Sequence, residues 1–121
     1  MNRLLLYLLV FISSMEMSSC KKDKIHVTYE TINVVIKVND TYVYDLGNSC
    51  PECGIGISRQ ATHYQTSVIK PDNSLKFSYQ YIPVQNYVGS DEVEIKFSQG
   101  SDGSSPNNSF HYLTIRFTIS N

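Results

Sequence analysis

The sequence has little charge and no excess of either sign. Its 121 residues include 10 Lys and Arg against 11 Asp and Glu, which gives a formal net charge of −1. Nucleic-acid-binding domains need a basic surface, and solvating tails need blocks of acidic residues, so neither class is expected.

Catalytic motifs are lacking as well. Gly54 and Gly56 form a Gly-x-Gly pair, but no helical pattern follows them, as a phosphate-binding loop requires. Ser58 and His63 are close in sequence, yet neither lies in a nucleophile elbow. We therefore expect no catalytic residues and no enzymatic activity.

No apolar run has the length of a membrane span. The run at residues 4–12, LLLYLLVFI, is shorter than the roughly 20 apolar residues that a transmembrane helix needs. It follows a short basic start at Arg3, and it has the length of a signal-peptide core, roughly 7–15 residues. The sequence therefore predicts a secretory signal.

The signal segment ends at residues 17–20, Met-Ser-Ser-Cys. This stretch resembles the lipobox of bacterial lipoproteins, in which an aliphatic residue, two small residues and a cysteine are read together. The resemblance implies that residues 1–19 are removed and that the Cys20 sulfur takes a diacylglyceryl group, with acyl chains such as palmitate. An ordinary signal cut elsewhere and an uncleaved N-terminal anchor are the alternatives.

Residues 21–24, Lys-Lys-Asp-Lys, form a charged tether after Cys20. A solvated spacer is the expected role. The stretch also partly resembles a charged motif that directs lipoproteins of some Gram-negative groups to the outer surface. The expected location is the cell envelope, anchored by lipid in the outer membrane, on its periplasmic or surface face.

Only three cysteines are present. With Cys20 assigned to the lipid, Cys50 and Cys53 remain as a pair, and an oxidising compartment favours a local disulfide between them. A redox dithiol, a zinc half-site and free thiols are the alternatives. A closed zinc site needs four ligands, and the chain has no second cysteine pair, so no metal or other cofactor is expected. Three scattered histidines could contribute ligands only if the fold brought them together: His26, His63 and His111.

The mature chain shows no helical period and no internal repeat. Apolar and polar residues instead alternate with period two, or form short β-rich runs, which indicates strands. The expected strands are residues 31–38, 41–46, 55–57, 63–69, 75–81, 93–97 and 113–119, and residues 99–109 read as a loop. The pattern predicts an all-β sandwich of about seven antiparallel strands. The expected domains are the signal (1–19), the lipidated cysteine with its tether (20–28) and the sandwich (29–121).

Two stretches resemble bacterial Ig-like, cadherin-like modules. They are residues 56–64, GISRQATHY, and the pair 79–83, YQYIP, with 87–93, YVGSDEV. The resemblance implies an Ig-like sandwich in which Gly89 makes a turn and Asp91 bonds backbone amides. It implies adhesion or assembly only loosely, because fold does not determine function. The acidic calcium motifs of that family are missing.

Asp91, Glu92 and Glu94 form a small acidic cluster. Alternation places Glu92 and Glu94 outward if their apolar neighbours point inward, so a solvated face is expected. A calcium site, which needs six to eight oxygen ligands, is the alternative.

The expected function is that of a membrane-anchored envelope lipoprotein that acts as a non-catalytic binding, adhesion or assembly module. Its partner would be an envelope protein or a surface ligand, contacted by exposed tyrosines or by residues 99–109. The alternative is a small envelope redox or metal-binding protein that uses Cys50 and Cys53.

Overall fold

The computed structural model describes residues 24–48, 50, 52–100 and 106–121. The signal segment and Cys20 lie outside the described residues. The strands are β1 (His26–Lys37), β2 (Tyr42–Asn48), β3 (Cys53–Arg59), β4 (Tyr64–Pro71), β5 (Lys76–Pro83), β6 (Gly89–Gln99) and β7 (Ser109–Ser120). No helix in the part of the chain described here is long and apolar enough to cross a membrane.

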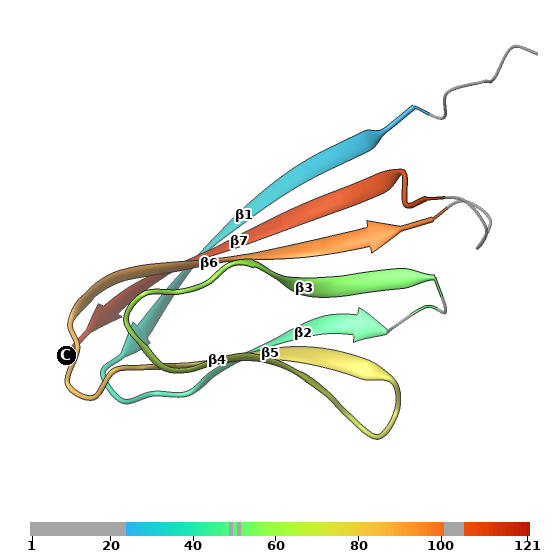
Figure 1. The fold of residues 1–121 in the computed structure, drawn as a ribbon. Coiled ribbons are helices and arrows are strands. Elements are labelled where there is room, and N and C mark those ends of the chain that lie inside the picture. The colour runs from blue at the N-terminus through green and yellow to red at the C-terminus, as the bar shows by residue number, and fades with distance from the viewer. Residues whose placement is uncertain (1–23, 49, 51, 101–105) are drawn as a thin grey trace, which may run out of the picture.

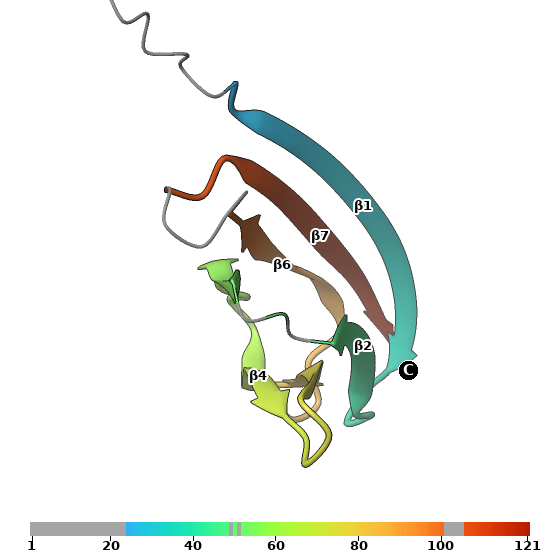
Figure 2. The ribbon, with the colours of Figure 1, turned by 90° about the vertical axis from the view of Figure 1, so that its right-hand side faces the viewer.

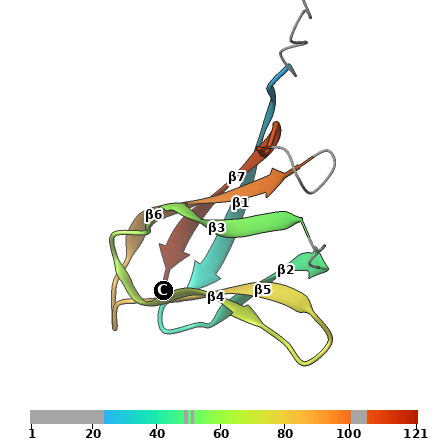
Figure 3. The same cartoon turned by 45° about the vertical axis from the view of Figure 1, so that its right-hand side comes forward.

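The strands form two sheets that pack face to face (Figures 1 and 3). One sheet has the order β1-β7-β6-β3 and the other the order β2-β5-β4. The predicted all-β sandwich of about seven strands is confirmed. Neighbours are antiparallel except for β1 and β7, which pair in parallel. These are the first and last strands, so no hairpin joins them and a parallel pair can form.

The core lies between the sheets and follows the predicted alternation. Tyr79 and Tyr81 of β5 are fully buried, and the ring of Tyr81 stacks on Phe117 of β7 with centroids 4.0 Å apart. Burial raises the pKa of Tyr79 to about 12, and its hydroxyl is hydrogen-bonded to Ser67 at 2.7 Å. The other buried apolar side chains on the four-stranded sheet are Val93, Ile95, Leu113, Ile115 and Ile119.

Several strands extend further than the alternation predicted, among them β1 and β7. β1 begins at His26, inside the expected tether, and β7 begins at Ser109 rather than at residue 113. These added residues pair with one another through the backbone, from His26 with Ser109 onward, although the side chains of residues 26–31 are exposed. Alternation reports burial of side chains, so a paired but exposed segment gives no signal.

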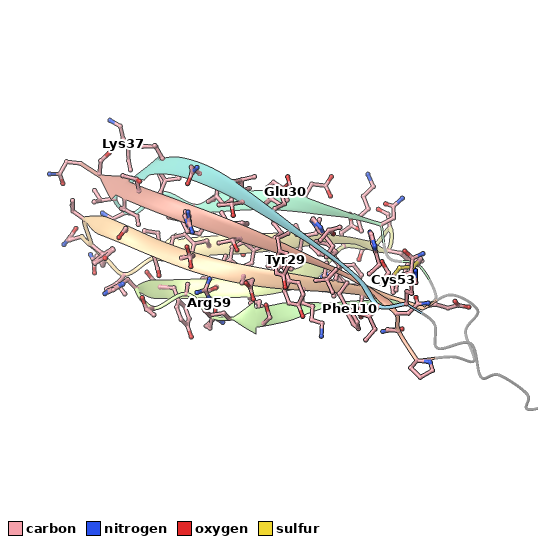
Figure 4. The ribbon with its side chains drawn as sticks, turned by 90° about the horizontal axis from the view of Figure 1, so that it is seen from above. Tyr29, Glu30, Lys37, Cys53, Arg59 and Phe110 are labelled. Carbon is pink, nitrogen blue, oxygen red and sulfur yellow. A yellow bond between two sulfur atoms is a disulfide. The ribbon has the colours of Figure 1, made fainter. Side chains whose placement is uncertain are left out.

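The sandwich has two ends with different connections. At one end, which we call the loop end, lie the start of β1, the β2–β3 and β6–β7 connections and the β4–β5 hairpin. At the other end, the turn end, lie the β1–β2, β3–β4 and β5–β6 connections and the C-terminus (Figure 1). Figure 4 shows Cys53 and Phe110 toward the loop end and Lys37 toward the turn end.

Candidate functional site

A cavity of about 510 Å³ opens between the two sheets at the loop end. Leu46 of β2 and Phe77 of β5 line it from one sheet, and Ile55 of β3 and Phe97 of β6 line it from the other. All four side chains are only half-buried, whereas fully buried apolar side chains such as Phe117 and Ile119 lie nearer the turn end. The core is therefore left open at this end.

The rim of this cavity carries the predicted cysteine pair. Cys50 and Cys53 form a disulfide with Cα atoms 5.0 Å apart, which confirms the expected bridge. The backbone N–H of Cys53 also donates to the carbonyl of Cys50 at 3.0 Å, so the two residues close a turn. Cys53 is the first residue of β3, and it lines the cavity.

The fold does not gather the three histidines. His111 lines the cavity with Cys53, His26 starts β1, and His63 lies at the turn end. Within the described ranges, no group of three or more His, Cys, Asp or Glu is arranged to hold a metal ion.

The His111 ring is held in place by β1. Its Nδ1 is hydrogen-bonded to the Thr28 hydroxyl at 2.8 Å, and its Nε2 lies 3.3 Å from a carboxylate oxygen of Glu30. The ring also packs against Phe97, with centroids 5.5 Å apart. These contacts fix one wall of the cavity.

The β4–β5 hairpin borders the same end. A carboxylate oxygen of Asp72 accepts the N–H of Ser74 at 2.7 Å and of Lys76 at 2.9 Å, and these bonds lower the pKa of Asp72. They bend the chain so that Leu75 adopts a left-handed backbone with φ 61°. Leucine is rarely found there, and this side chain is 72% exposed. Alternation had placed Leu75 at the start of a strand, but it lies in the turn.

The predicted contact surfaces are placed only in part. Gln99 and Ser109, which bound the expected loop, line the cavity, while residues 101–105 lie outside the described residues. Tyr29 is 76% exposed on the outer face of the four-stranded sheet, where its ring stacks on Tyr112 with centroids 5.3 Å apart.

The turn end is organised around Asp91, which is 6% exposed. Its carboxylate accepts the N–H groups of Thr62 and His63, each at 2.8 Å, and the hydroxyl of Tyr81 at 2.8 Å. Burial opposes ionisation, but these hydrogen bonds outweigh it and hold the pKa of Asp91 below its usual value. Gly89 has φ 148°, but it is the first residue of β6 and lies outside the turn that precedes this strand. Of the two roles implied by the Ig-like resemblance, the bonding of backbone amides by Asp91 is present, and the turn at Gly89 is not.

The acidic cluster is divided between the two faces of its strand. Asp91 points inward, whereas Glu92 points outward and pairs with Arg59 and Arg116. Glu94 accepts a hydrogen bond from the Ser58 hydroxyl at 2.7 Å. Each carboxylate therefore has its own protein partners, and the three do not converge.

Comparison with known proteins identifies the architecture and no family. No protein-family model and no curated protein matches the chain. A cysteine protease inhibitor from Entamoeba histolytica is 18% identical, with 79% of this chain and 95% of the inhibitor covered and a TM-score of 0.48. An endo-fucoidan hydrolase of glycoside hydrolase family 107 is 11% identical over 74% of this chain, with a TM-score of 0.51, and this chain spans only 12% of its length. At an identity this low, the likeness to the hydrolase shows a shared fold alone.

Proposed function

We propose that this protein is a lipid-anchored envelope lipoprotein that acts as a non-catalytic binding module through its loop end. The observation that carries the binding site is the cavity between the sheets. Its volume of about 510 Å³ lies in the range of small-ligand sites, roughly 300–1,000 Å³. Its apolar walls suit an apolar side chain or other apolar group of an envelope protein or surface ligand.

Two residues that line the cavity support this proposal because protein contacts hold them. The disulfide to Cys50 restrains Cys53, and the hydrogen bond with Thr28 and the contact with the Glu30 carboxylate restrain His111. A site held in its binding conformation loses less entropy when a partner binds. The exposed Leu75 on the neighbouring hairpin adds apolar surface at the same end.

The proposed anchor would keep this site close to the bilayer. Cys20 precedes the first residue of β1, His26, by six positions. Even fully extended, six residues span no more than about 22 Å. Because β1 starts at the loop end, a lipid on Cys20 would hold the cavity near the membrane, where its partner would also have to be.

Site-specific photocrosslinking tests the binding site. The photoreactive residue benzoylphenylalanine replaces Gln99, which is exposed on the cavity rim, or Gln85, which is exposed at the turn end. In intact cells, we expect a discrete adduct from position 99 and none from position 85. Equal adducts from both positions, or none from either, would contradict the site.

A cavity-filling variant sharpens this test. Ser109→Phe places a ring in the cavity and should reduce the adduct from position 99 at least tenfold. Ser120→Phe makes the same substitution at the turn end of β7 and should leave the adduct unchanged.

The anchor is tested separately by the intact mass of the membrane-extracted protein. We expect loss of residues 1–19 and a gain of two or three acyl groups. Incorporation of an alkyne-labelled palmitate should be lost in Cys20→Ser. An unlipidated mass would overturn the anchor and leave the loop-end site to the crosslinking result.

A further inference from the structure

β1 is an unusual edge strand. Each sheet has two edges, formed by β1 and β3 in one sheet and by β2 and β4 in the other. The pairings of β2, β3 and β4 are all interrupted by register shifts, and each of these strands has seven or eight residues. β1 has twelve residues in one unbroken register. Short strands and bulges are devices that prevent an edge from pairing with another chain, and β1 has neither.

Charge and proline do not protect β1 either. The strand contains no proline, and its acidic residue, Glu30, is paired with His111 of its own sheet. Lys37 is its last residue. Figure 2 shows β1 along the outer edge of the sheet, with β7 on one side and no described strand on the other.

The backbone groups that face this edge can be assigned. The N–H of His26 donates to Asn108 at 2.7 Å, and the N–H of Val38 donates to Ser120 at 2.8 Å, so even-numbered residues face β7. The direction alternates along a strand, and each residue turns its N–H and C=O to the same side. The odd-numbered residues from Val27 to Lys37 therefore present their N–H and C=O groups to the outer edge.

The two most exposed apolar side chains of β1 are spaced symmetrically along the same edge. Tyr29 and Val35 are 76% and 74% exposed, and both lie on the outer face. They are equidistant from Ile32, three positions on either side. An antiparallel copy related by a two-fold axis at Ile32 would set Tyr29 opposite Val35 of the second copy, at both symmetry-related places.

This register also pairs all the outward-facing residues of β1. Among antiparallel registers, the one centred on Ile32 pairs every odd-numbered residue from Val27 to Lys37 with another, and such pairs exchange two hydrogen bonds each. Lys37 faces Val27, and Glu30 faces Val34, so no like charges meet across the strands.

We infer that β1 pairs with β1 of a second copy of this chain, antiparallel about a two-fold axis at Ile32, to form one eight-stranded sheet. The interface is self-complementary, as two-fold symmetry requires. The two loop ends lie at opposite ends of the joint sheet, so both cavities stay open. The inference does not depend on the proposed binding function.

Charge exchange at the paired positions tests this register. The full chain is produced in cells and extracted in mild detergent. Its molar mass is then measured by sedimentation equilibrium in a buffer whose density matches that of the detergent. The unsubstituted protein should be a dimer. The double variant Tyr29→Lys with Val35→Lys brings like charges together at two places, and its dissociation constant should rise at least tenfold. The double variant Tyr29→Lys with Val35→Glu brings opposite charges together there and should restore the dimer.

A control adds the same charge to the other sheet. Val43 and Val68 are exposed, and Val43→Lys with Val68→Lys should leave the dimer intact. Thermal unfolding followed by circular dichroism checks that all three double variants fold. A monomeric unsubstituted protein, equal effects of the two charge variants, or a complex with a different protein on this edge would overturn the inference.

Discussion

The turn end and the loop end of this sandwich differ in how well their residues suit their positions. At the turn end, Asn39 and Asn86 have left-handed backbones, with φ 65° and 61°, and the N–H of Asn86 donates to the Asn39 side chain at 3.0 Å. At the loop end, Leu75 has the same conformation, and its apolar side chain is exposed. Asparagine tolerates this backbone and leucine does not. The residues with a left-handed backbone at the turn end therefore suit that conformation, whereas Leu75 at the loop end does not.

The same contrast holds for the interior. The Asp91 carboxylate satisfies two backbone N–H groups and the Tyr81 hydroxyl at the turn end. The apolar walls of the cavity at the loop end remain half-buried. Buried polar groups that are paired, as around Asp91, contribute stability, whereas an open cavity with apolar walls is suited to bind a partner. The predictions below separate these two contributions.

The largest effect on stability is expected at Asp91. Asp91→Ala removes the acceptor of the Thr62 and His63 N–H groups and leaves the Tyr81 hydroxyl with only its longer bond to the His63 carbonyl, at 3.2 Å. Loss of several buried or part-buried hydrogen bonds is costly, and we expect the free energy of unfolding to fall by about 3 kcal/mol. Chemical denaturation measures this change. The adduct from position 99 should persist below the unfolding transition, because the cavity lies at the other end.

Asp40→Ala is the matched control, since Asp40 is exposed and accepts only a long bond from Lys37 at 3.3 Å. It should change the free energy of unfolding by less than about 0.5 kcal/mol. A similar small loss in Asp91→Ala would show that the turn end does not depend on this carboxylate.

The pH dependence of stability gives the same residue a second readout. The pKa of Asp91 is lowered in the folded protein, so its contribution is present above the ordinary Asp value of about 3.9 and is lost as the pH falls through the folded pKa. The unsubstituted protein should therefore lose more stability in acid than Asp91→Ala does. Denaturation curves between pH 2 and 7 compare the two slopes.

A smaller effect is expected from the disulfide. Cys50→Ser with Cys53→Ser opens a bridge between residues three positions apart, and the loop-entropy relation gives a loss of about 2 kcal/mol. The adduct from position 99 should also fall, because the cavity rim is no longer restrained. Loss of stability without any loss of the adduct would limit the bridge to a structural role.

The redox alternative for Cys50 and Cys53 is tested by a different experiment. After mild reduction, an alkylation assay measures whether either cysteine is a reactive thiol of low pKa.

The alternation of apolar and polar residues predicted which side chains are buried, but it did not predict where a strand begins. Alternation correctly placed Phe77, Tyr79 and Tyr81 on the inner face of one strand, because burial has the period of the pleat. The same alternation wrongly added Leu75, because it cannot show where the chain reverses. That reversal depends on hydrogen bonds from the Asp72 side chain.

Less of the candidate site than of the fold could be predicted from the sequence. The Cys50–Cys53 bridge could be predicted, since its two residues are neighbours in the chain and the signal implied an oxidising compartment. The cavity could not, because its walls come from five strands in two sheets. Their meeting depends on how the sheets pack, which local patterns do not encode.

The smallest effect, and the sharpest test of the contrast, is expected at Leu75. Leu75→Asn places a residue that tolerates the left-handed backbone in this exposed turn, and the free energy of unfolding should rise by about 0.5–1 kcal/mol. Val84→Asn replaces an exposed apolar residue at the turn end, where φ is not positive, and should give no such gain.

The crosslinked adduct from position 99 then tests whether Leu75 contacts a partner. If its side chain is kept at a strained position because a partner contacts it, Leu75→Asn should reduce the adduct from position 99 several-fold while the protein becomes more stable. Gains in one property with losses in the other are typical of sites shaped for binding. If the variant is more stable and still gives the full adduct, the β4–β5 hairpin is not part of the binding site, and the site is limited to the cavity.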